Sequence, residues 1–197
     1  MAINAKQVKE LREKTGAGMM NCKKALTEVD GDFEKAVIYL REQGVSSAAK
    51  KEGRSTAEGL IATYVHTGDK LAVMVEINCE TDFVARTDEF RGFARDVAMH
   101  IAASSPLCVN REELDQDTIE KEREVYRQQA INDGKPEKIV DKIVNGRIEK
   151  YYSEVVLMEQ PFVKDSDKIV QDFVNGTIAS LGENIRIARF TRYRLGE

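Results

Sequence analysis

The sequence predicts an α+β protein in which an N-terminal three-helix bundle precedes a core domain with a three-stranded antiparallel sheet, packing helices and a helical insertion. Apolar residues recur at helical spacing in residues 5–43, whereas residues 59–78 and the carboxyl end of the chain show the two-residue alternation of strands. The 197 residues suffice for one ordinary domain of about 100 to 150 residues and a small satellite. We therefore expect a bundle with its linker at residues 1–54 and the core domain at residues 55–197.

Composition limits the classes of protein to which the chain can belong. Hydrophobic residues make up 42% and charged residues 32%, a globular balance, and the net charge of -4 comes without a sustained basic face for nucleic acid. No apolar run reaches the roughly 18 residues that a membrane helix needs, and residues 1–10 are too polar for a secretory signal. We expect a cytoplasmic protein that binds neither nucleic acid directly nor a membrane.

The sequence offers little material for catalysis or metal binding. Cys22, Cys79 and Cys108 are widely spaced and form no CxxC pair, and His66 and His100 have no neighbour at metal-ligand spacing. We expect reduced, mostly buried thiols and ordinary histidines. No catalytic residue, metal site or cofactor is predicted, and the protein is not expected to be an enzyme.

Short amphipathic helices are predicted throughout the first domain. Asp32 is expected to cap the third helix, Gly44 to end it, and residues 45–54 to form a partly helical linker. Because three short helices bury only a small core, the region resembles a ubiquitin-associated (UBA)-like bundle that presents a surface. The apolar positions of the three helices are Val8 and Leu11; Met19, Cys22, Leu26 and Val29; and Phe33, Ala36, Val37 and Leu40.

The core domain begins with a predicted β-hairpin. Residues 59–66 and 70–78 are strand-like and are joined by Thr67-Gly68-Asp69. A long helix is expected to follow from about Thr87 to residue 104 and to seal the sheet with a stripe of apolar side chains. That stripe consists of Phe90, Phe93, Ala94, Val97, Ala98 and Ile101.

The remaining segments complete the predicted core. Residues 112–152 are charged and broken at 133–136, which indicates two solvated helices forming an arm. A further helix is expected at 167–181, with Gly182 as its stop. A last strand is expected at 184–193, in which Ile185 and Ile187 alternate with polar residues and the pattern continues to Thr191 and Tyr193. Its arginines, Arg186, Arg189, Arg192 and Arg194, favour a solvated edge, with a subunit contact as the alternative.

The run Thr15-Gly16-Ala17-Gly18-Met19-Met20 resembles a phosphate-binding loop only superficially. It lacks the GKS or GKT ending and follows a helix rather than a strand. By spacing alone the simpler interpretation is a tight turn with both methionines entering the core. The functional interpretation is that adaptable methionines at a loop edge contact a partner.

Asp82 and Phe83 lie between the second strand and the long helix, where loops commonly carry function. In the simpler interpretation Thr81 or Asp82 caps a helical turn and Phe83 folds inward as a staple. An exposed Phe83 could instead enter an apolar pocket of a partner and gain roughly 1.5 to 3 kcal/mol from burial. The exposure of Phe83 distinguishes these interpretations.

Four segments, residues 11–26, 80–86, 159–165 and 182–185, occur in the order seen in the elongation factor Ts family, and the chain resembles that family along nearly its whole length. The length is similar to that of the short bacterial members, which have one core unit where longer members have two. Thr87 departs from the family pattern, in which Asn is common at that position.

The resemblance implies a guanine nucleotide exchange factor that binds elongation factor Tu in its GDP-bound and nucleotide-free states. It implies that Thr81, Asp82, Phe83 and Val84 dislodge the magnesium ion beside the GDP phosphates of that partner. It also implies that bundle residues face the GTPase domain of the partner, and that the chain forms a two-fold homodimer through its core sheet. The bundle residues in question are Lys9, Met19, Met20 and Lys23.

Two other hypotheses stay open on the sequence alone. The bundle could belong to a general UBA-like adaptor that binds ubiquitin-like or ribosomal surfaces. An enzyme that uses a pair of carboxylates is the third hypothesis, although no such constellation is visible in the sequence.

Overall fold

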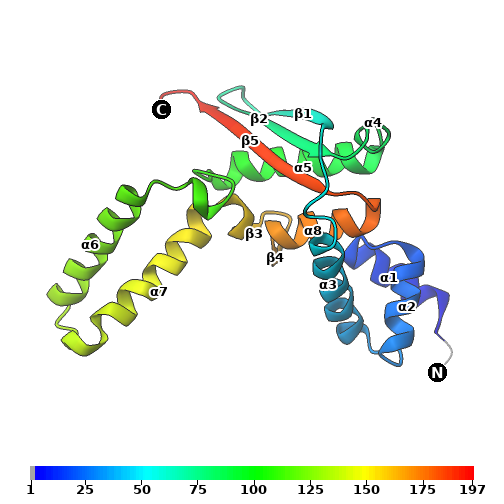
Figure 1. Ribbon diagram of the computed structural model, residues 1–197, viewed down its shortest axis with the longest axis horizontal. Helices are drawn as coiled ribbons and strands as arrows, with labels where there is room; N and C mark the ends of the chain where they lie inside the picture. The colour runs from blue at the N-terminus through cyan, green and yellow to red at the C-terminus, as the bar shows by residue number, and fades with distance from the viewer. Residues whose placement is uncertain (1–2) are drawn as a thin grey trace. The chain divides into compact units, whose positions relative to one another are not determined.

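The computed structural model describes residues 3–197, so the first two positions of the predicted bundle region lie outside the described residues. By internal contacts the chain divides into two compact units (Figure 1). One contains the residues up to Met99 together with Gln171–Glu197, and the other is His100–Val170. The predicted mixture of helices with a three-stranded antiparallel sheet is confirmed.

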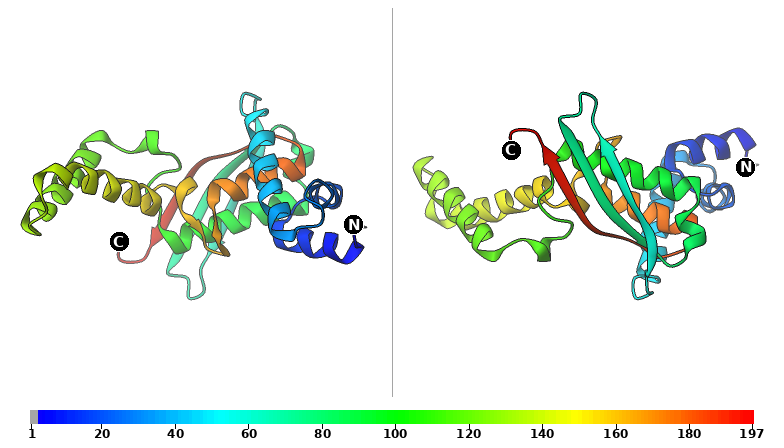
Figure 2. Two further views of the ribbon diagram at one scale, coloured as in Figure 1. Left: turned by 90° about the horizontal axis from the view of Figure 1, so that it is seen from below. Right: turned by 90° about the horizontal axis from the view of Figure 1, so that it is seen from above.

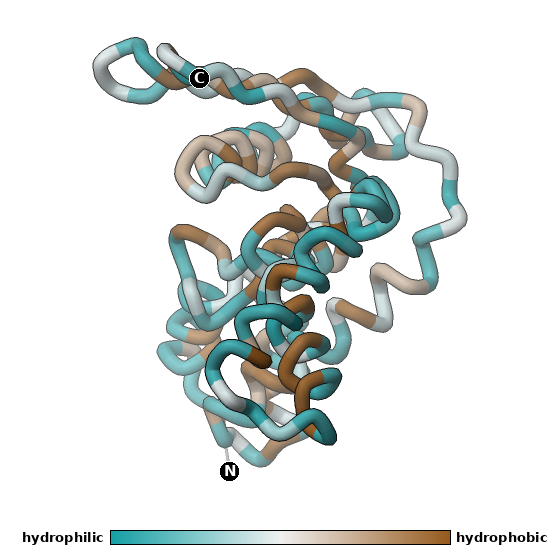
Figure 3. Tube along the Cα trace, turned by 90° about the vertical axis from the view of Figure 1, so that its left-hand side faces the viewer, coloured by the Kyte–Doolittle hydropathy of each residue, from teal (hydrophilic) through white to brown (hydrophobic). Residues whose placement is uncertain are grey.

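The three predicted helices of the bundle are present as α1 (Ala5–Thr15), α2 (Met19–Glu28) and α3 (Phe33–Ala49). Asp32 caps α3, because its carboxylate accepts a hydrogen bond from the backbone N–H of Lys35 at 3.1 Å. Along the helices of the chain in general, hydrophobic and hydrophilic residues alternate (Figure 3), as expected for helices with one apolar face. The buried side chains of the bundle are Val8, Leu11, Cys22, Ala25, Leu26 and Ala36.

The predicted stop at Gly44 is wrong, since α3 continues to Ala49 and Gly44 is buried within it. A Cβ atom at this position would lie 3.6 Å from the backbone oxygen of Asn175 in α8 (Val170–Leu181). The two helix backbones therefore lie close together at Gly44, with room for a methyl group in ordinary van der Waals contact. Arg41 and Asp172 join the same two helices in an ion pair of 2.8 Å.

The sheet has the strand order β1 (Glu58–Val65), β2 (Leu71–Cys79) and β5 (Ile185–Arg194), with both pairs antiparallel. The predicted hairpin is confirmed, within one residue at each strand end. One face of β2 is buried through Val73, Val75, Ile77 and Cys79. Helices α5 (Asp88–Ser104) and α8 lie along this side of the sheet (Figure 2), and the rings of Phe93 and Phe173 are 5.0 Å apart.

A bulge in β5 changes which of its side chains face inward. Ile187 lies opposite Ile77 and Arg189 lies opposite Glu76, so Ala188 is an extra residue. Beyond it Phe190 is opposite the buried Val75, whereas Tyr193 is exposed. The predicted alternation is therefore correct up to Ile187 and wrong beyond it.

The other face of the sheet is not covered by the described helices of this unit (Figure 2). Ile61 and Val65 of β1, Met74 of β2 and Tyr193 of β5 are exposed there. An apolar surface thus runs across all three strands.

The second unit contains the predicted pair of helices, α6 (Gln116–Asn132) and α7 (Glu137–Val155), and the predicted break between them is confirmed. The unit also has short 3-10 turns, η1 (Arg111–Glu113) and η2 (Leu157–Glu159), and a small hairpin of β3 (Pro161–Phe162) and β4 (Asp165–Ile169). The prediction that a helix begins at residue 167 is wrong, because residues 165–169 pair with β3 and α8 begins only at Val170.

Candidate functional site

The segment between β2 and α5 forms a single helical turn, α4 (Asp82–Ala85), that leaves Phe83 in solvent. Thr81 caps the turn, because its hydroxyl oxygen accepts a hydrogen bond from the backbone N–H of Val84 at 3.4 Å. Ala85 is buried and Val84 is partly buried, whereas Phe83 exposes 80% of its surface. The predicted cap is confirmed, and the inward staple is wrong.

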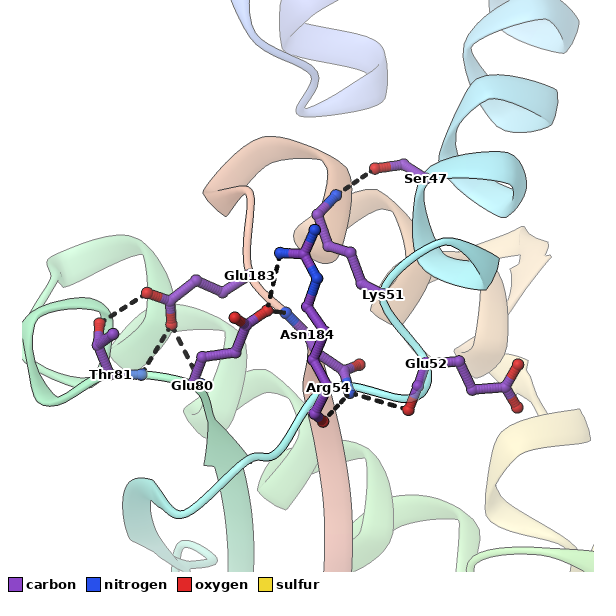
Figure 4. A network of polar contacts seen from close by, with 8 residues as sticks. All are labelled: Ser47, Lys51, Glu52, Arg54, Glu80, Thr81, Glu183 and Asn184. Carbon is purple, nitrogen blue, oxygen red and sulfur yellow. Dashed lines mark hydrogen bonds and ion pairs between the residues drawn. The ribbon is translucent and has the colours of Figure 1, made fainter.

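The start of this turn is bound to the segment that connects α8 with β5 (Figure 4). One carboxylate oxygen of Glu183 accepts hydrogen bonds from the backbone N–H groups of Glu80, at 3.1 Å, and Thr81, at 3.0 Å. The other oxygen accepts from the Thr81 hydroxyl at 2.6 Å. Three donors from the two residues before α4 therefore converge on one carboxylate.

The end of the turn is fixed by Thr87, whose hydroxyl donates to the carbonyl oxygen of Val84 at 2.8 Å and accepts from the N–H of Phe90 at 3.2 Å. Thr87 thus joins α4 to the first turn of α5. The departure from the family pattern at this position leaves the turn intact.

Asp82 lies on the surface of the turn and forms an ion pair of 2.8 Å with Arg86, four residues later. Both side chains are substantially exposed, so the pair contributes little to stability. The carboxylate is therefore accessible to groups outside the chain.

The other predicted site residues lie on the bundle. Met19 and Met20 begin α2 with 45% and 74% of their surfaces exposed, so the interpretation that placed them in the core is wrong. Lys23 is exposed one turn later on the same helix. Lys9 is exposed on α1 and pairs with Glu13 at 3.7 Å. Figure 1 shows α4 and the bundle toward the same end of their unit.

Among residues 3–197, no cluster of three or more His, Cys, Asp or Glu side chains has the arrangement of a metal site. Cys22, Cys79 and Cys108 are buried free thiols, as predicted, and burial raises the pKa of each. Across the same residues, none of the helices combines the length and apolarity of a membrane span.

Sequence reasoning gave no role to Glu183 or Asn184, although both belong to a segment that carries the family resemblance. Glu183 and Thr81 are 102 residues apart, so no local pattern could have paired them. The only local signal was the predicted helix stop at Gly182, just before these two residues.

Comparison with known proteins gives a consistent result over nearly the whole chain. A family model described as Elongation factor TS matches residues 4–197. A protein named Elongation factor Ts from Desulforamulus reducens is 61% identical over 195 residues, which cover 99% of this chain and 90% of that protein. Proteins with the same name from Maridesulfovibrio salexigens and Geotalea uraniireducens are 58% and 57% identical over 197 residues, covering 100% of this chain and 96% and 91% of theirs.

Proposed function

Because the chain belongs to the elongation factor Ts family, we propose that it is a guanine nucleotide exchange factor that promotes release of GDP from elongation factor Tu during translation elongation. It binds the GDP-bound partner and remains on the nucleotide-free form until a new nucleotide enters. The exchange needs only binding energy and no covalent step, so the protein acts without being an enzyme. The observation that carries this proposal is the family match over residues 4–197. The place of action is the cytoplasm, where translation occurs.

The turn formed by Thr81, Asp82, Phe83 and Val84 is the part of the chain that acts on the nucleotide site. The exposure of Phe83 supports this role, because an exposed ring can gain roughly 1.5 to 3 kcal/mol on entering an apolar pocket. Magnesium neutralises phosphate charge and requires near-octahedral coordination, so a small displacement of its surroundings weakens GDP binding. The Asp82 carboxylate, which is paired with the exposed Arg86, competes for polar groups in that pocket.

The N-terminal region, residues 1–54, is a UBA-like bundle that binds the GTPase domain of the partner through Lys9, Met19, Met20 and Lys23. Met19, Met20 and Lys23 support this role, since all three lie on the exposed side of α2 while Cys22 and Leu26 lie in the bundle core. Methionine side chains adapt readily to a partner surface. The core domain, residues 55–197, contains the α4 turn with Phe83 and the helical insertion.

The core domain also mediates a two-fold homodimer through the uncovered face of its sheet. Ile61, Val65, Met74 and Tyr193 support this proposal, because they place exposed apolar side chains on all three strands of one face. Contiguous apolar surface of this kind is typical of an interface.

The proposed activity is tested by stopped-flow release of fluorescent GDP from elongation factor Tu at saturating concentrations of this protein. The wild-type chain accelerates release, Phe83→Ala slows the accelerated rate by about 10-fold or more, and Asp82→Ala combined with Phe83→Ala slows it further. Leu195→Ala is the matched control, because Leu195 is a similarly exposed apolar residue outside the turn.

Unchanged release in the double variant would defeat the assigned role of the turn. No acceleration by the wild-type chain would defeat the exchange activity itself. In that case a pull-down from a bacterial lysate would be decisive. Recovery of other proteins but no elongation factor Tu would favour a UBA-like adaptor function over nucleotide exchange.

A further inference from the structure

We propose that Glu183 positions Phe83 for nucleotide exchange by fixing the backbone from which the α4 turn begins. This inference rests on the proposed exchange function, to which it adds a positioning residue outside the turn. Glu183 does not need to touch the partner. It acts through Glu80 and Thr81, the two residues before the helical turn, to which it is hydrogen-bonded.

The α4 turn cannot hold its own conformation. A helix of four residues is far shorter than the roughly 12 to 15 residues at which isolated helices become marginally stable in water. Phe83 is exposed and makes few packing contacts that could fix its direction. The position of its ring in the free protein therefore depends on how firmly the backbone of the turn is anchored.

Glu183 supplies the anchor at the start of the turn. Its carboxylate accepts hydrogen bonds from the Glu80 and Thr81 amides and from the Thr81 hydroxyl, at 3.1, 3.0 and 2.6 Å. Hydrogen bonds to an ionised acceptor are roughly twice as strong as neutral ones. Thr81 is also the cap of α4, so the same carboxylate fixes both the main chain and the side chain of the capping residue.

The end of α8 places Glu183 where it can reach the turn. The amide of Gly182 donates to the carbonyl oxygen of Ile178 at 3.0 Å, which completes the helix end. Gly182 then takes a left-handed conformation with φ of 78°, which a residue with a side chain rarely adopts. The chain reverses there, and Glu183 faces Thr81 from the short segment between α8 and β5 (Figure 4).

Asn184 extends this anchor to the end of the linker that follows α3. Its backbone N–H donates to the Glu80 carboxylate at 2.6 Å. Its side-chain amide donates to the carbonyl oxygens of Arg54, at 3.0 Å, and Glu52, at 3.3 Å. Asn184 is only 8% exposed, so these bonds are largely shielded from water. Two consecutive residues just before β5 thus bind both the start of the α4 turn and the end of the linker.

Two substitutions of Glu183 separate its hydrogen bonds from its charge. Glu183→Ala removes all three acceptor contacts. In Glu183→Gln the amide oxygen can still accept from the two backbone N–H groups, and the Thr81 hydroxyl can accept from the new amide group. If Glu183 acts by positioning, the glutamine variant retains most of the function that the alanine variant loses.

The mobility of the side chain at position 83 is a direct readout in the free protein. The chain contains no tryptophan and six tyrosines, so Phe83→Trp introduces a single tryptophan at the tip of the turn, which is excited selectively at wavelengths where tyrosine hardly absorbs. We expect Glu183→Ala to lower the residual fluorescence anisotropy of this reporter and Glu183→Gln to leave it near the parent value. Glu89→Ala, an exposed carboxylate on α5, is the matched control. Equal anisotropy in the alanine variant and its parent would overturn the proposal.

The exchange assay then tests whether Glu183 acts through Phe83. We expect Glu183→Ala to lower the maximal rate of GDP release about 10-fold, and to have little further effect when Phe83 is already alanine. The proposal would be contradicted if Glu183→Ala slowed GDP release just as strongly when Phe83 is already alanine. It would also be contradicted if the Glu183→Ala variant released GDP at the wild-type rate. If the wild-type chain released no GDP, the exchange function would fail, while the anisotropy would still decide whether Glu183 positions the turn.

Discussion

At the scale of single residues, Phe83 and His100 are both placed against the usual preference of their type. Phe83 is apolar and exposed, whereas His100 is polar and fully buried. Leaving Phe83 in water forgoes roughly 1.5 to 3 kcal/mol of burial free energy in the free protein. That free energy becomes available when a partner covers the ring, which is why an exposed aromatic residue on an anchored turn suits a binding role.

The hydrogen bonds of the second unit fix the orientation of the buried His100 ring. Its Nδ1 accepts from the backbone N–H of Val163 at 3.2 Å, so the ring proton is on Nε2, which donates to the side-chain oxygen of Gln160 at 2.9 Å. The side-chain nitrogen of Gln160 donates in turn to the carbonyl oxygen of Glu154 at 2.6 Å. Burial lowers the pKa of His100 below the ordinary value of 6.5.

We therefore predict that His100 makes the protein less stable as the pH falls. The unfolded chain takes up a proton near pH 6.5 and the folded chain only at lower pH, so this contribution to stability is complete above pH 6.5 and is lost on acidification. Between pH 7.5 and 5.5 the loss is at most about 1.4 kcal/mol. Urea unfolding at the two pH values measures it.

His100→Asn is the informative variant, because asparagine keeps an acceptor near Nδ1 but does not titrate. The His100→Asn variant should lose less unfolding free energy between pH 7.5 and 5.5 than the wild-type protein. His66→Asn, which replaces an exposed histidine, should lose as much as the wild-type protein. The same pH dependence in all three proteins would rule out this role for His100.

At the scale of elements, the contact between α3 and α8 limits the size of the side chain at position 44. Gly44 lies where the two backbones approach, and the position that a Cβ atom would occupy is in ordinary van der Waals contact with Asn175, at 3.6 Å. Space for one methyl group is therefore present, but space for a branched side chain is not.

We predict opposite effects for two substitutions of Gly44. Gly44→Ala should stabilise the protein by about 0.5 to 1 kcal/mol, because alanine favours the helix and its methyl group fits. Gly44→Leu should destabilise it by about 1 to 3 kcal/mol, because the side chain would force α3 away from α8. Thermal unfolding followed by circular dichroism measures both.

Gly146, a helical glycine of α7 with open space around its Cβ position, provides the control. Gly146→Leu should be tolerated. If Gly44→Leu were equally tolerated, the close approach of the two helices would not constrain this position.

At the scale of the whole molecule, nucleotide exchange requires that the nucleotide and this protein weaken each other's binding to elongation factor Tu. If the chain weakens GDP binding to elongation factor Tu by a given factor, GDP weakens binding of the chain by the same factor. The exchange factor is therefore released when a nucleotide rebinds, which allows one molecule to act repeatedly.

The proposed homodimer gives a prediction for the molecule as a whole. Val65→Lys combined with Met74→Lys places two positive charges on the uncovered face of the sheet, where both wild-type side chains are exposed. The monomer should fold as before, while the dimer should dissociate because the charges lose water in the interface. Sedimentation equilibrium measures the mass.

Leu107→Lys, at an exposed apolar residue of the second unit, is the matched control and should leave the mass unchanged. A wild-type chain that sediments as a monomer would contradict the dimer. A double variant with the wild-type dimer mass would assign the interface to another surface.

The sequence by itself determined the periodic elements and the family, because both depend on local patterns. The helical spacing in the bundle, the alternation in β2 and the break at residues 133–136 each predicted the observed element. The ordered motifs predicted the family that the comparisons show.

Only the tertiary structure decided which residues of those elements are exposed and what holds them. Spacing favoured Met19 in the core, yet it is exposed at the start of α2, and the extra residue Ala188 reverses the faces of β5. Gly44 and Glu183 have roles set by partners more than 100 residues away in the chain. Such contacts arise when the chain folds and leave no periodic signal, so the anchor of Phe83 could be found only in three dimensions.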